Sequence, residues 1–176
     1  IVGMTGTGKS SLLAGILGES NIISGSIGIG INNDLSRNKN EGVSYAAQNA
    51  WIQNATLRDN ILFGTPFDED RYTAVIHACA LDVDIAGMKG GDLTEIGEKG
   101  INLSGGQQQR INIARAAYSR SPIIILDDVL SAVDPHVAAH LMTHLINGFL
   151  NRPEERRTRI LVSHQLALTV PCADKV

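Results

Sequence analysis

The sequence has the length of a single domain and an ordinary composition. It has 176 residues, of which 43% are hydrophobic and 19% charged, and its formal net charge is −3. This composition excludes a disordered chain, and the slight negative charge excludes a protein that coats nucleic acid through a basic surface. No apolar run approaches the ~20 residues that span a bilayer. The two cysteines, Cys79 and Cys172, fit no disulfide or zinc pattern and are expected to be buried thiols.

The first half of the chain predicts a strand end, a helix and two further strands. The apolar residues 1–2 run into a glycine-rich loop, and residues 9–18 repeat leucine and isoleucine at helical spacing. Residues 24–31 and 43–47 predict two short strands, because small and β-branched residues alternate or cluster there and a polar stretch joins them. Two helices are then predicted, at residues 56–62 and 69–80.

The second half alternates helices with buried strands. Ser104 has a side chain typical of a helix N-cap and precedes a helical pattern that ends near residue 119. The β-branched run at residues 123–126 ends in two aspartates, as a parallel strand buried on both faces would. Asp134 and the proline after it begin a helix expected to reach about residue 150, and residues 159–163 predict another strand. This alternation predicts an α/β fold with a mostly parallel sheet flanked by helices.

A phosphate-binding loop is predicted at residues 3–10, which read Gly-Met-Thr-Gly-Thr-Gly-Lys-Ser and satisfy G-x-x-x-x-G-K-[ST]. The motif lies between the expected strand end and helix start, where backbone N–H groups and the helix dipole attract phosphate. Lys9 is expected to reach the β- and γ-phosphates of a nucleotide, and Ser10 to ligate Mg²⁺. Residues 84–87 and 38–41 imitate GTPase motifs. Residues 84–87 do not end an apolar strand, and residues 38–41 come before residues 84–87 in the sequence. We therefore interpret both motifs as coincidences.

A second anion-binding helix start follows at residues 103–107, Leu-Ser-Gly-Gly-Gln. With this motif, the sequence resembles the nucleotide-binding domain of ABC transporters over essentially its whole length. Residues 103–107 resemble the signature motif, residues 3–10 the Walker A motif and residues 123–127 the Walker B strand. The remaining motifs of the family also have counterparts in order: Gln48 for the Q-loop, residues 131–134 for the D-loop and His164 for the switch histidine.

The resemblance implies a P-loop NTPase core with a helical signature-motif subdomain. A RecA-like core would comprise about residues 1–47 and 121–176, and a helical insert about residues 49–119. We expect the chain to be a partial domain that lacks N-terminal strands and the C-terminal end. Residues 48–64 and 98–102 further resemble the multidrug-resistance-associated (ABC-C) subfamily, and residues 126–134 resemble its first nucleotide-binding domain.

The same resemblance assigns roles to individual residues. The nucleotide would be bound by Gly3, Met4, Thr5, Gly6, Thr7, Gly8, Lys9, Ser10, Ser11 and Gln48. Mg²⁺ would be held by Ser10, Gln48 and Asp127, and the catalytic groups would be Asp128, His164 and Gln48. The signature residues Ser104, Gly105, Gly106 and Gln107 would act on ATP held by a partner domain. The D-loop residues would be Ser131, Ala132 and Asp134.

Asp128 departs from the family pattern. Most hydrolytic domains of this family carry a glutamate after the Walker B aspartate, and the side chain of aspartate is one methylene shorter. Because proton transfer and the positioning of water depend steeply on distance, we expect this site to bind ATP well and to hydrolyse it poorly.

The resemblance thus implies the ATP-binding domain of an ATP-driven exporter, with ATP and Mg²⁺ as cofactors. It would be an ATP hydrolase that pairs head to tail with a second nucleotide-binding domain of the same polypeptide. It would act on transmembrane domains outside this chain, at the cytosolic face of a plasma or vacuolar membrane, and on no nucleic acid. Two alternatives are a regulatory module that binds ATP without hydrolysing it and a soluble ABC ATPase without a transport role.

Two charged patterns have simpler interpretations. His136, His140 and His144 repeat every four residues and could in principle bind zinc. An apolar stripe runs beside them, so we interpret the histidines as a solvated helix face. Residues 152–159 mix arginine with glutamate and are interpreted as a solvated loop.

Overall fold

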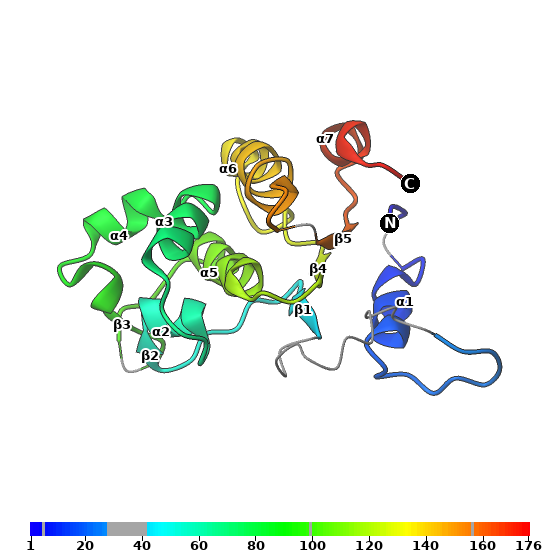
Figure 1. The fold of residues 1–176 in the computed structure, drawn as a ribbon, viewed down its shortest axis with the longest axis horizontal. Helices are drawn as coiled ribbons and strands as arrows, with labels where there is room; N and C mark the ends of the chain where they lie inside the picture. The colour runs from blue at the N-terminus through cyan, green and yellow to red at the C-terminus, as the bar shows by residue number, and fades with distance from the viewer. Residues whose placement is uncertain (5, 28–41, 99, 156) are drawn as a thin grey trace.

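A three-stranded parallel sheet lies in the middle of the molecule (Figure 1). In this computed structural model, which describes residues 1–4, 6–27, 42–98, 100–155 and 157–176, its order is β1 (Val43–Ala46), β4 (Ile123–Asp127) and β5 (Thr158–Val162). Val2 continues the sheet beyond β5 through a parallel bridge to Ser163. Helices flank the sheet, so the predicted α/β fold with a parallel sheet is confirmed.

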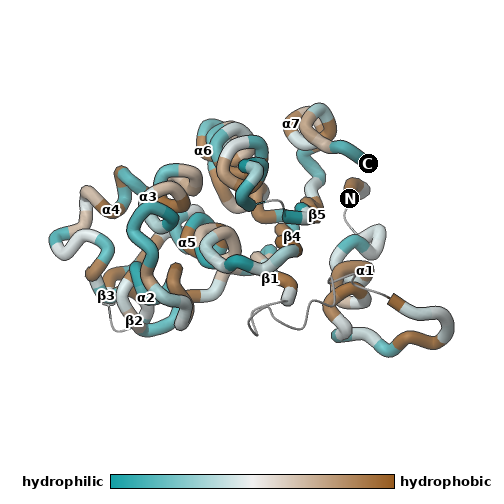
Figure 2. Tube along the Cα trace, in the orientation of Figure 1, coloured by the Kyte–Doolittle hydropathy of each residue, from teal (hydrophilic) through white to brown (hydrophobic). Residues whose placement is uncertain are grey.

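The central strand β4 is buried on both faces, as the sequence pattern predicts. Ile124 and Leu126 belong to the large core that also contains residues of α5 (Gly105–Tyr118) and α6 (Pro135–His140). Ile125 packs instead with Leu13 of α1 (Lys9–Ile16). Successive side chains of a strand point to opposite faces, so a strand with helices on both sides needs a continuous apolar run. Figure 2 shows hydrophobic residues gathering around the sheet, between α1 and α6.

The chain between β1 and β4 forms a helical segment at one end of the molecule, opposite α1 (Figure 1). Thr56 and Asp68 cap the helices predicted at residues 56–62 and 69–80, which are confirmed in outline. α5 packs against α2 (Leu57–Leu62), α3 (Glu69–Ala78) and β1, so it joins this segment to the sheet. The other elements of the segment are α4 (Asp82–Gly87), η1 (Gly91–Leu93) and the antiparallel pair β2 (Ala55–Thr56) and β3 (Glu95–Ile96).

The helix predicted to run from Asp134 to about residue 150 is interrupted. It begins as α6, continues as a π-helix at η2 (Leu141–Ile146), and ends in the 3₁₀-helix η3 (Phe149–Asn151). The break lies at Gly148, where a Cβ atom would meet the carbonyl oxygen of His144 at 2.4 Å. Only glycine allows this close approach of the backbone. The predicted apolar stripe is nevertheless present, since Leu141, Leu145 and Phe149 are buried.

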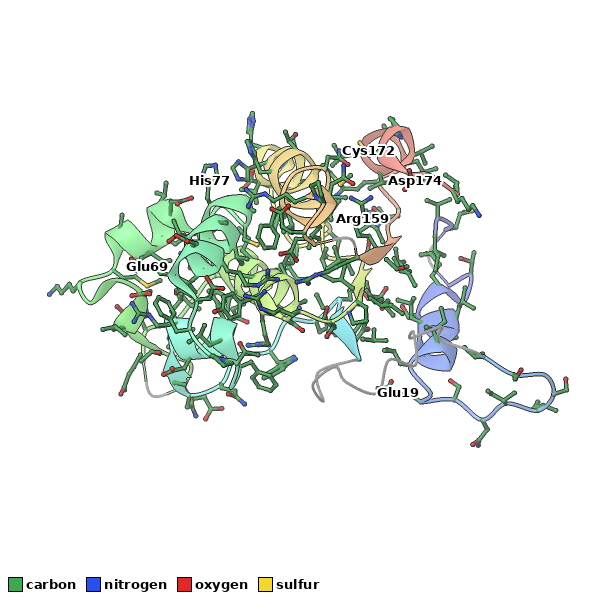
Figure 3. All side chains as sticks on the ribbon, viewed as in Figure 1. Glu19, Glu69, His77, Arg159, Cys172 and Asp174 are labelled. Carbon is green, nitrogen blue, oxygen red and sulfur yellow. The ribbon has the colours of Figure 1, made fainter. Side chains whose placement is uncertain are left out.

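Two further expectations need correction. Residues 24–27 form no strand, and residues 28–31 lie outside the described part of the chain. No described strand lies beside residues 24–27, and a strand needs a partner for its backbone hydrogen bonds. Cys79 is buried as expected, but Cys172 is exposed. It lies where α7 (Leu166–Thr169) and η4 (Val170–Cys172) end the chain's regular structure, beside Asp174 on the outer surface (Figure 3).

The segment at residues 152–159 was also predicted wrongly as a solvated loop. The side chains of Glu155 and Arg157 are only 8% and 2% exposed, and they form an ion pair of 2.8 Å. Arg71 of α3 completes this buried cluster: it pairs with both Glu155 oxygens and donates to the carbonyl groups of Ala117 and Tyr118 at the end of α5. Glu155 pairs with both arginines, and the carbonyl groups at the C-terminal end of α5 accept hydrogen bonds from Arg71, so the buried charges have partners.

The environment of this cluster shifts the pKa values of its members. Burial by itself raises the pKa of Glu155, but the hydrogen bond from Arg71 and the charge of Arg157 outweigh burial, and the net pKa is lowered. Burial lowers the pKa of Arg157 to about 10, so this side chain still carries its proton at neutral pH.

Among the described helices, none combines the length and apolar character needed to cross a bilayer.

Candidate nucleotide-binding site

The phosphate-loop motif folds into a turn that leads directly into α1. Gly6 and Gly8 have φ values of +83° and +88°, which favour glycine. Gly8 is the N-cap of α1 and offers no side chain to the first N–H groups of the helix, so these remain available to an anion. Lys9 Nζ donates to the carbonyl oxygens of Gly3 at 2.9 Å and Met4 at 2.8 Å. Thr7 Oγ1 also donates to Met4, while Thr5 lies outside the described residues.

A cleft of about 300 Å³ opens beside this loop. Its walls come from four segments that are distant in sequence: the phosphate loop with α1, the turn after β1, the end of β4 and the turn after β5. The carboxyl ends of parallel strands meet at one edge of a sheet, where ligands of α/β proteins bind. The structure thus brings together nine of the predicted residues, namely Gly6, Gly8, Lys9, Ser10, Ser11, Gln48, Asp127, Asp128 and His164.

Asp128 is in contact with both other predicted catalytic residues. Its Oδ2 accepts a hydrogen bond from Gln48 Nε2 at 3.2 Å, and its Oδ1 lies 2.9 Å from His164 Nδ1. The backbone of Asp128 has a φ value of +49°, a left-handed conformation that aspartate tolerates better than most side chains. The N–H group of Asp128 donates to Val162 of β5 at 3.0 Å. The Asp128 carboxylate therefore links the ends of three strands.

Asp127 has one satisfied carboxylate oxygen and one orphaned oxygen. Its Oδ2 accepts a hydrogen bond from the phenolic hydroxyl of Tyr45 at 3.2 Å. Its Oδ1 is buried and has no hydrogen-bond partner among the residues that the structure describes. A buried carboxylate oxygen without a partner is costly, and a cation would remove this cost. Ser10, Gln48 and Asp127 line the same cleft, and each of their side chains carries an oxygen atom, the kind of ligand that Mg²⁺ prefers, so these residues fit the ion.

Tyr45 was missed as a functional candidate. Its strand was predicted, but the sequence does not reveal that β1 pairs with β4 in the register that aligns Tyr45 with Ile125. Only this pairing brings the phenol to Asp127. The one sequence signal is alternation, which places Tyr45 on the opposite face of the strand from Ser44 and Ala46.

The signature motif forms a capped helix start away from this cleft. Ser104 Oγ accepts from the Gln107 N–H at 3.2 Å, and Gln107 Oε1 accepts from the Ser104 N–H at 2.9 Å. This reciprocal capping box confirms the predicted N-cap. Gly106 lies beside the D-loop, since a Cβ atom there would come within 3.4 Å of the carbonyl oxygen of Ala132. Among the described residues lining the cleft, none belongs to the signature Ser104, Gly105, Gly106 and Gln107.

Removing the Ser104 hydroxyl should separate its capping role from any contact with a ligand. We expect Ser104→Ala to lower the local stability of α5 by about 1 kcal/mol, and Ser104→Gly by only a few tenths, because glycine is a tolerated N-cap. Hydrogen exchange of the first turn of α5 measures this difference in the full-length protein. Equal exchange in the two variants would show that the cap does not hold the helix start.

The D-loop residues and the GTPase-like residues have structural contacts. Ser131 Oγ donates to the Asp128 carbonyl oxygen at 2.6 Å. Asp134 caps α6 by accepting two backbone N–H groups at 3.0 Å, and these hydrogen bonds lower its pKa. Residues 84–87 lie within α4, where Asp84 accepts from Gln107 Nε2 and pairs with Arg110 at 2.6 Å. This position inside a helix agrees with a coincidental motif, whereas residues 38–41 lie outside the described part.

Two of the three histidines in and after α6, His140 and His144, lie close to His77 of α3. His140 and His144 have ring centroids 4.2 Å apart, and His77 lies within 5.7 Å of both rings, on the side of α3 that faces α6 (Figure 3). His140 Nε2 lies 2.8 Å from the backbone carbonyl oxygen of His77. In the described ranges, no group of three or more His, Cys, Asp or Glu side chains is arranged to hold a metal ion. His136 and His144 are exposed, as predicted, while His140 is half-buried.

Comparison with known proteins decides the family. Residues 1–131 match the protein family described as ABC transporter. The chain belongs to this family. It is an ATP-binding domain of the ABC transporter type, and the predicted resemblance to that domain is confirmed.

Related ABC transporters of subfamily C match nearly the whole chain. It is 51% identical to ABC transporter C family member 7 of Dictyostelium discoideum, over 100% of the chain and 12% of that protein. It is 51% identical to multidrug resistance protein mrp-7 of Caenorhabditis elegans, over 96% of the chain and 10% of that protein. It is 47% identical to ATP-binding cassette sub-family C member 2 of Mus musculus, over 100% of the chain and 11% of that protein. The chain thus spans about a tenth of the length of these curated relatives.

Proposed function

We propose that this domain drives an ATP-dependent exporter of the multidrug-resistance-associated type, and that its own site binds Mg·ATP well but hydrolyses it slowly. The observation that carries the proposal is the cleft, in which the phosphate loop, Asp127, Asp128, Gln48 and His164 meet. The names of relatives support export, since they include a pleiotropic efflux transporter of multiple drugs and an ATP-dependent bile acid permease.

Binding would use the phosphate loop and the start of α1. Lys9 already lies across the loop, held by two carbonyl oxygens, so a phosphate group entering the loop would exchange places with them. The N–H groups at the start of α1 would surround the phosphate, together with the loop backbone. Bound Mg²⁺ would neutralise charge on the phosphate oxygens, and Ser10, Gln48 and Asp127 would hold it.

Slow hydrolysis follows from the reach and the neighbours of Asp128. A catalytic carboxylate has to accept or orient the attacking water within hydrogen-bond distance. Aspartate is one methylene shorter than glutamate, and both Asp128 oxygens already contact protein side chains, Gln48 and His164. We therefore assign Asp128 to the water, His164 to the γ-phosphate and Gln48 to both the metal and the nucleotide. In this site the catalytic carboxylate does not reach as far as that of a glutamate would.

The position of the signature motif supports pairing with a second nucleotide-binding domain. Its capped helix start lies away from the cleft of the same chain. Apart from its chain neighbours and its own helix backbone, no described residue has a heavy atom within 4 Å of the position where a Cβ of Gly105 would stand. An anion from another chain or domain could therefore approach its backbone N–H groups. A head-to-tail pair would place each signature against the partner's ATP. Such a pair would act on transmembrane domains of the same protein, at the cytosolic face of a plasma or vacuolar membrane.

Loss of the Lys9 ammonium tests nucleotide binding at this site. We expect Lys9→Ala to weaken ATP binding about tenfold or more, because it removes charge-assisted hydrogen bonds to the phosphates. Photolabelling of the full-length protein with an azido-ATP, quantified on peptides of this domain, measures binding at this site separately from any second site. Lys89→Ala is the control, since Lys89 does not line the cleft. Equal labelling of wild type and Lys9→Ala would contradict the proposal.

A regulatory module that binds ATP without hydrolysing it is the second candidate. The contacts of Asp128 favour it, since they leave the carboxylate partly engaged. The effect of lengthening this side chain on ATP hydrolysis distinguishes the two candidates.

A further inference from the structure

Tyr45 lies on the face of the sheet that carries the phosphate loop. β1 runs parallel to β4, with Tyr45 opposite Ile125. Ile125 packs with Leu13 of α1, and alternation puts Ile125 and Asp127 on the same face of β4. The Tyr45 side chain therefore extends along that face toward the end of β4, where its hydroxyl donates to Asp127 Oδ2 at 3.2 Å.

This hydrogen bond places the two oxygens of the Asp127 carboxylate in different environments. Asp127 is only 3% exposed, so solvent does not satisfy its oxygens. Oδ2 is occupied by the phenol, and Oδ1 is left buried without a partner in the described part of the molecule. A carboxylate rotates about its χ2 bond over a broad range, and a hydrogen bond to one oxygen restricts that rotation. The oxygen without a partner is then the one available to a cation.

The Tyr45 hydroxyl is a phenol, a group with an ordinary pKa of ~10. The phenol consequently keeps its proton at neutral pH and acts as a donor to the carboxylate. Because the ring is partly exposed and the hydroxyl is the only atom that makes this contact, replacing tyrosine by phenylalanine removes the hydrogen bond and keeps the ring.

We propose that Tyr45 is a positioning residue for Mg²⁺: its hydroxyl holds Asp127 so that Oδ1 faces the ion. The inference rests on the proposed nucleotide site and adds a residue outside the phosphate loop, the Walker B pair and the Q-loop. Groups that orient a metal ligand through a hydrogen bond typically change metal affinity by about 10- to 100-fold when they are removed. Removing the Tyr45 hydroxyl should therefore weaken the binding of Mg²⁺ and leave the binding of metal-free nucleotide unchanged.

The test is a Mg²⁺ titration of azido-ATP labelling in the full-length protein, read on peptides of this domain. In Tyr45→Phe we expect the half-maximal Mg²⁺ concentration to rise about tenfold, with labelling in EDTA unchanged. The control is Tyr118→Phe, which removes a hydroxyl that donates to the Pro66 carbonyl oxygen and accepts from the Asp68 N–H. Tyr118 does not line the cleft, so this change should leave the Mg²⁺ midpoint unchanged.

Each outcome of the titration has a defined meaning. An unchanged Mg²⁺ midpoint in Tyr45→Phe would overturn the positioning role. Equal loss of labelling in EDTA and in Mg²⁺ would also overturn it, because a merely structural role predicts that pattern. If the wild type is labelled neither in Mg²⁺ nor in EDTA, the proposed nucleotide site itself is refuted. If the wild type labels and responds to Mg²⁺ while Tyr45→Phe behaves identically, only the inference about Tyr45 fails.

Discussion

Replacing Glu155 with alanine is expected to lower the free energy of unfolding by about 3–5 kcal/mol, because two buried guanidinium groups lose the carboxylate that they share. Arg157 is the more vulnerable of the two, since its side chain is 2% exposed and Glu155 is its only ion-pair partner among the described residues. Arg71 would keep its bonds to the carbonyl groups at the end of α5. The loss of stability should therefore be largest at the junction of α3, α5 and the segment before β5.

The neighbouring carboxylate provides the control. Glu154 is exposed, so Glu154→Ala should change stability by less than about 0.5 kcal/mol. Hydrogen exchange on peptides of α3 and α5 in the full-length protein measures the local free energy of opening for both variants. Similar exchange in Glu154→Ala and Glu155→Ala would contradict a stabilising role for the buried cluster.

Acid gives a second readout for the same cluster. The folded-state pKa of Glu155 is lowered, so its contribution is fully present above the pKa of an unfolded glutamate, ~4.3, and is lost as pH falls through the folded-state pKa. The difference in stability between wild type and Glu155→Ala should therefore shrink below about pH 4.3. A difference that is constant down to pH 3 would argue that the glutamate acts through packing alone.

Lengthening Asp128 to glutamate is expected to raise ATP hydrolysis at this site by about 10- to 100-fold. The added methylene would carry the carboxylate past its present contacts with Gln48 and His164 and toward the water beside the γ-phosphate. The gain has a local cost, because glutamate is less well suited than aspartate to the φ value of +49° at this position. We expect that cost to lower stability by about 1 kcal/mol without reducing ATP binding.

Turnover of the full-length protein, with labelling resolved on peptides of this domain after vanadate trapping, measures the effect at this site. Asp128→Asn is the control: it keeps the shape of the side chain and removes the charge, so it should retain ATP labelling and show no gain in turnover. If Asp128→Glu leaves turnover unchanged, the argument from the shortened carboxylate is wrong. A regulatory site that never hydrolyses ATP would also show no gain, and the proposal of slow hydrolysis would then give way to it.

Features whose signals are local could be predicted from the sequence. The burial of β4 on both faces follows from an uninterrupted apolar run, and the start of α5 follows from Ser104 and Gln107, whose side chains satisfy each other's backbone groups. The phosphate loop is likewise encoded by glycines that adopt positive φ and by the lysine after them. In each case, the residues that determine the geometry are close together in the chain.

Features that depend on pairing between distant segments could not be predicted. The hydrogen bond from Tyr45 to Asp127 requires β1 to lie next to β4, and the sequence does not state the order of strands. Glu155 reads as part of a polar loop until Arg71 is known to lie against it. The break at Gly148 is similar, because the cost of a side chain there comes from the His144 carbonyl group in a π-helical turn that periodicity does not reveal.

The two ends of α5 are anchored to different parts of the molecule. Its C-terminal carbonyl groups are fixed by Arg71 to the segment before β5, whereas its N-terminal end carries the signature motif. A helix of 14 residues is ~21 Å long. A rotation of ~10° about the fixed end therefore moves the signature by ~4 Å, about the span of one hydrogen-bonded contact. In the proposed head-to-tail pair, a small tilt of α5 would thus be enough to engage or release the partner's ligand at the signature.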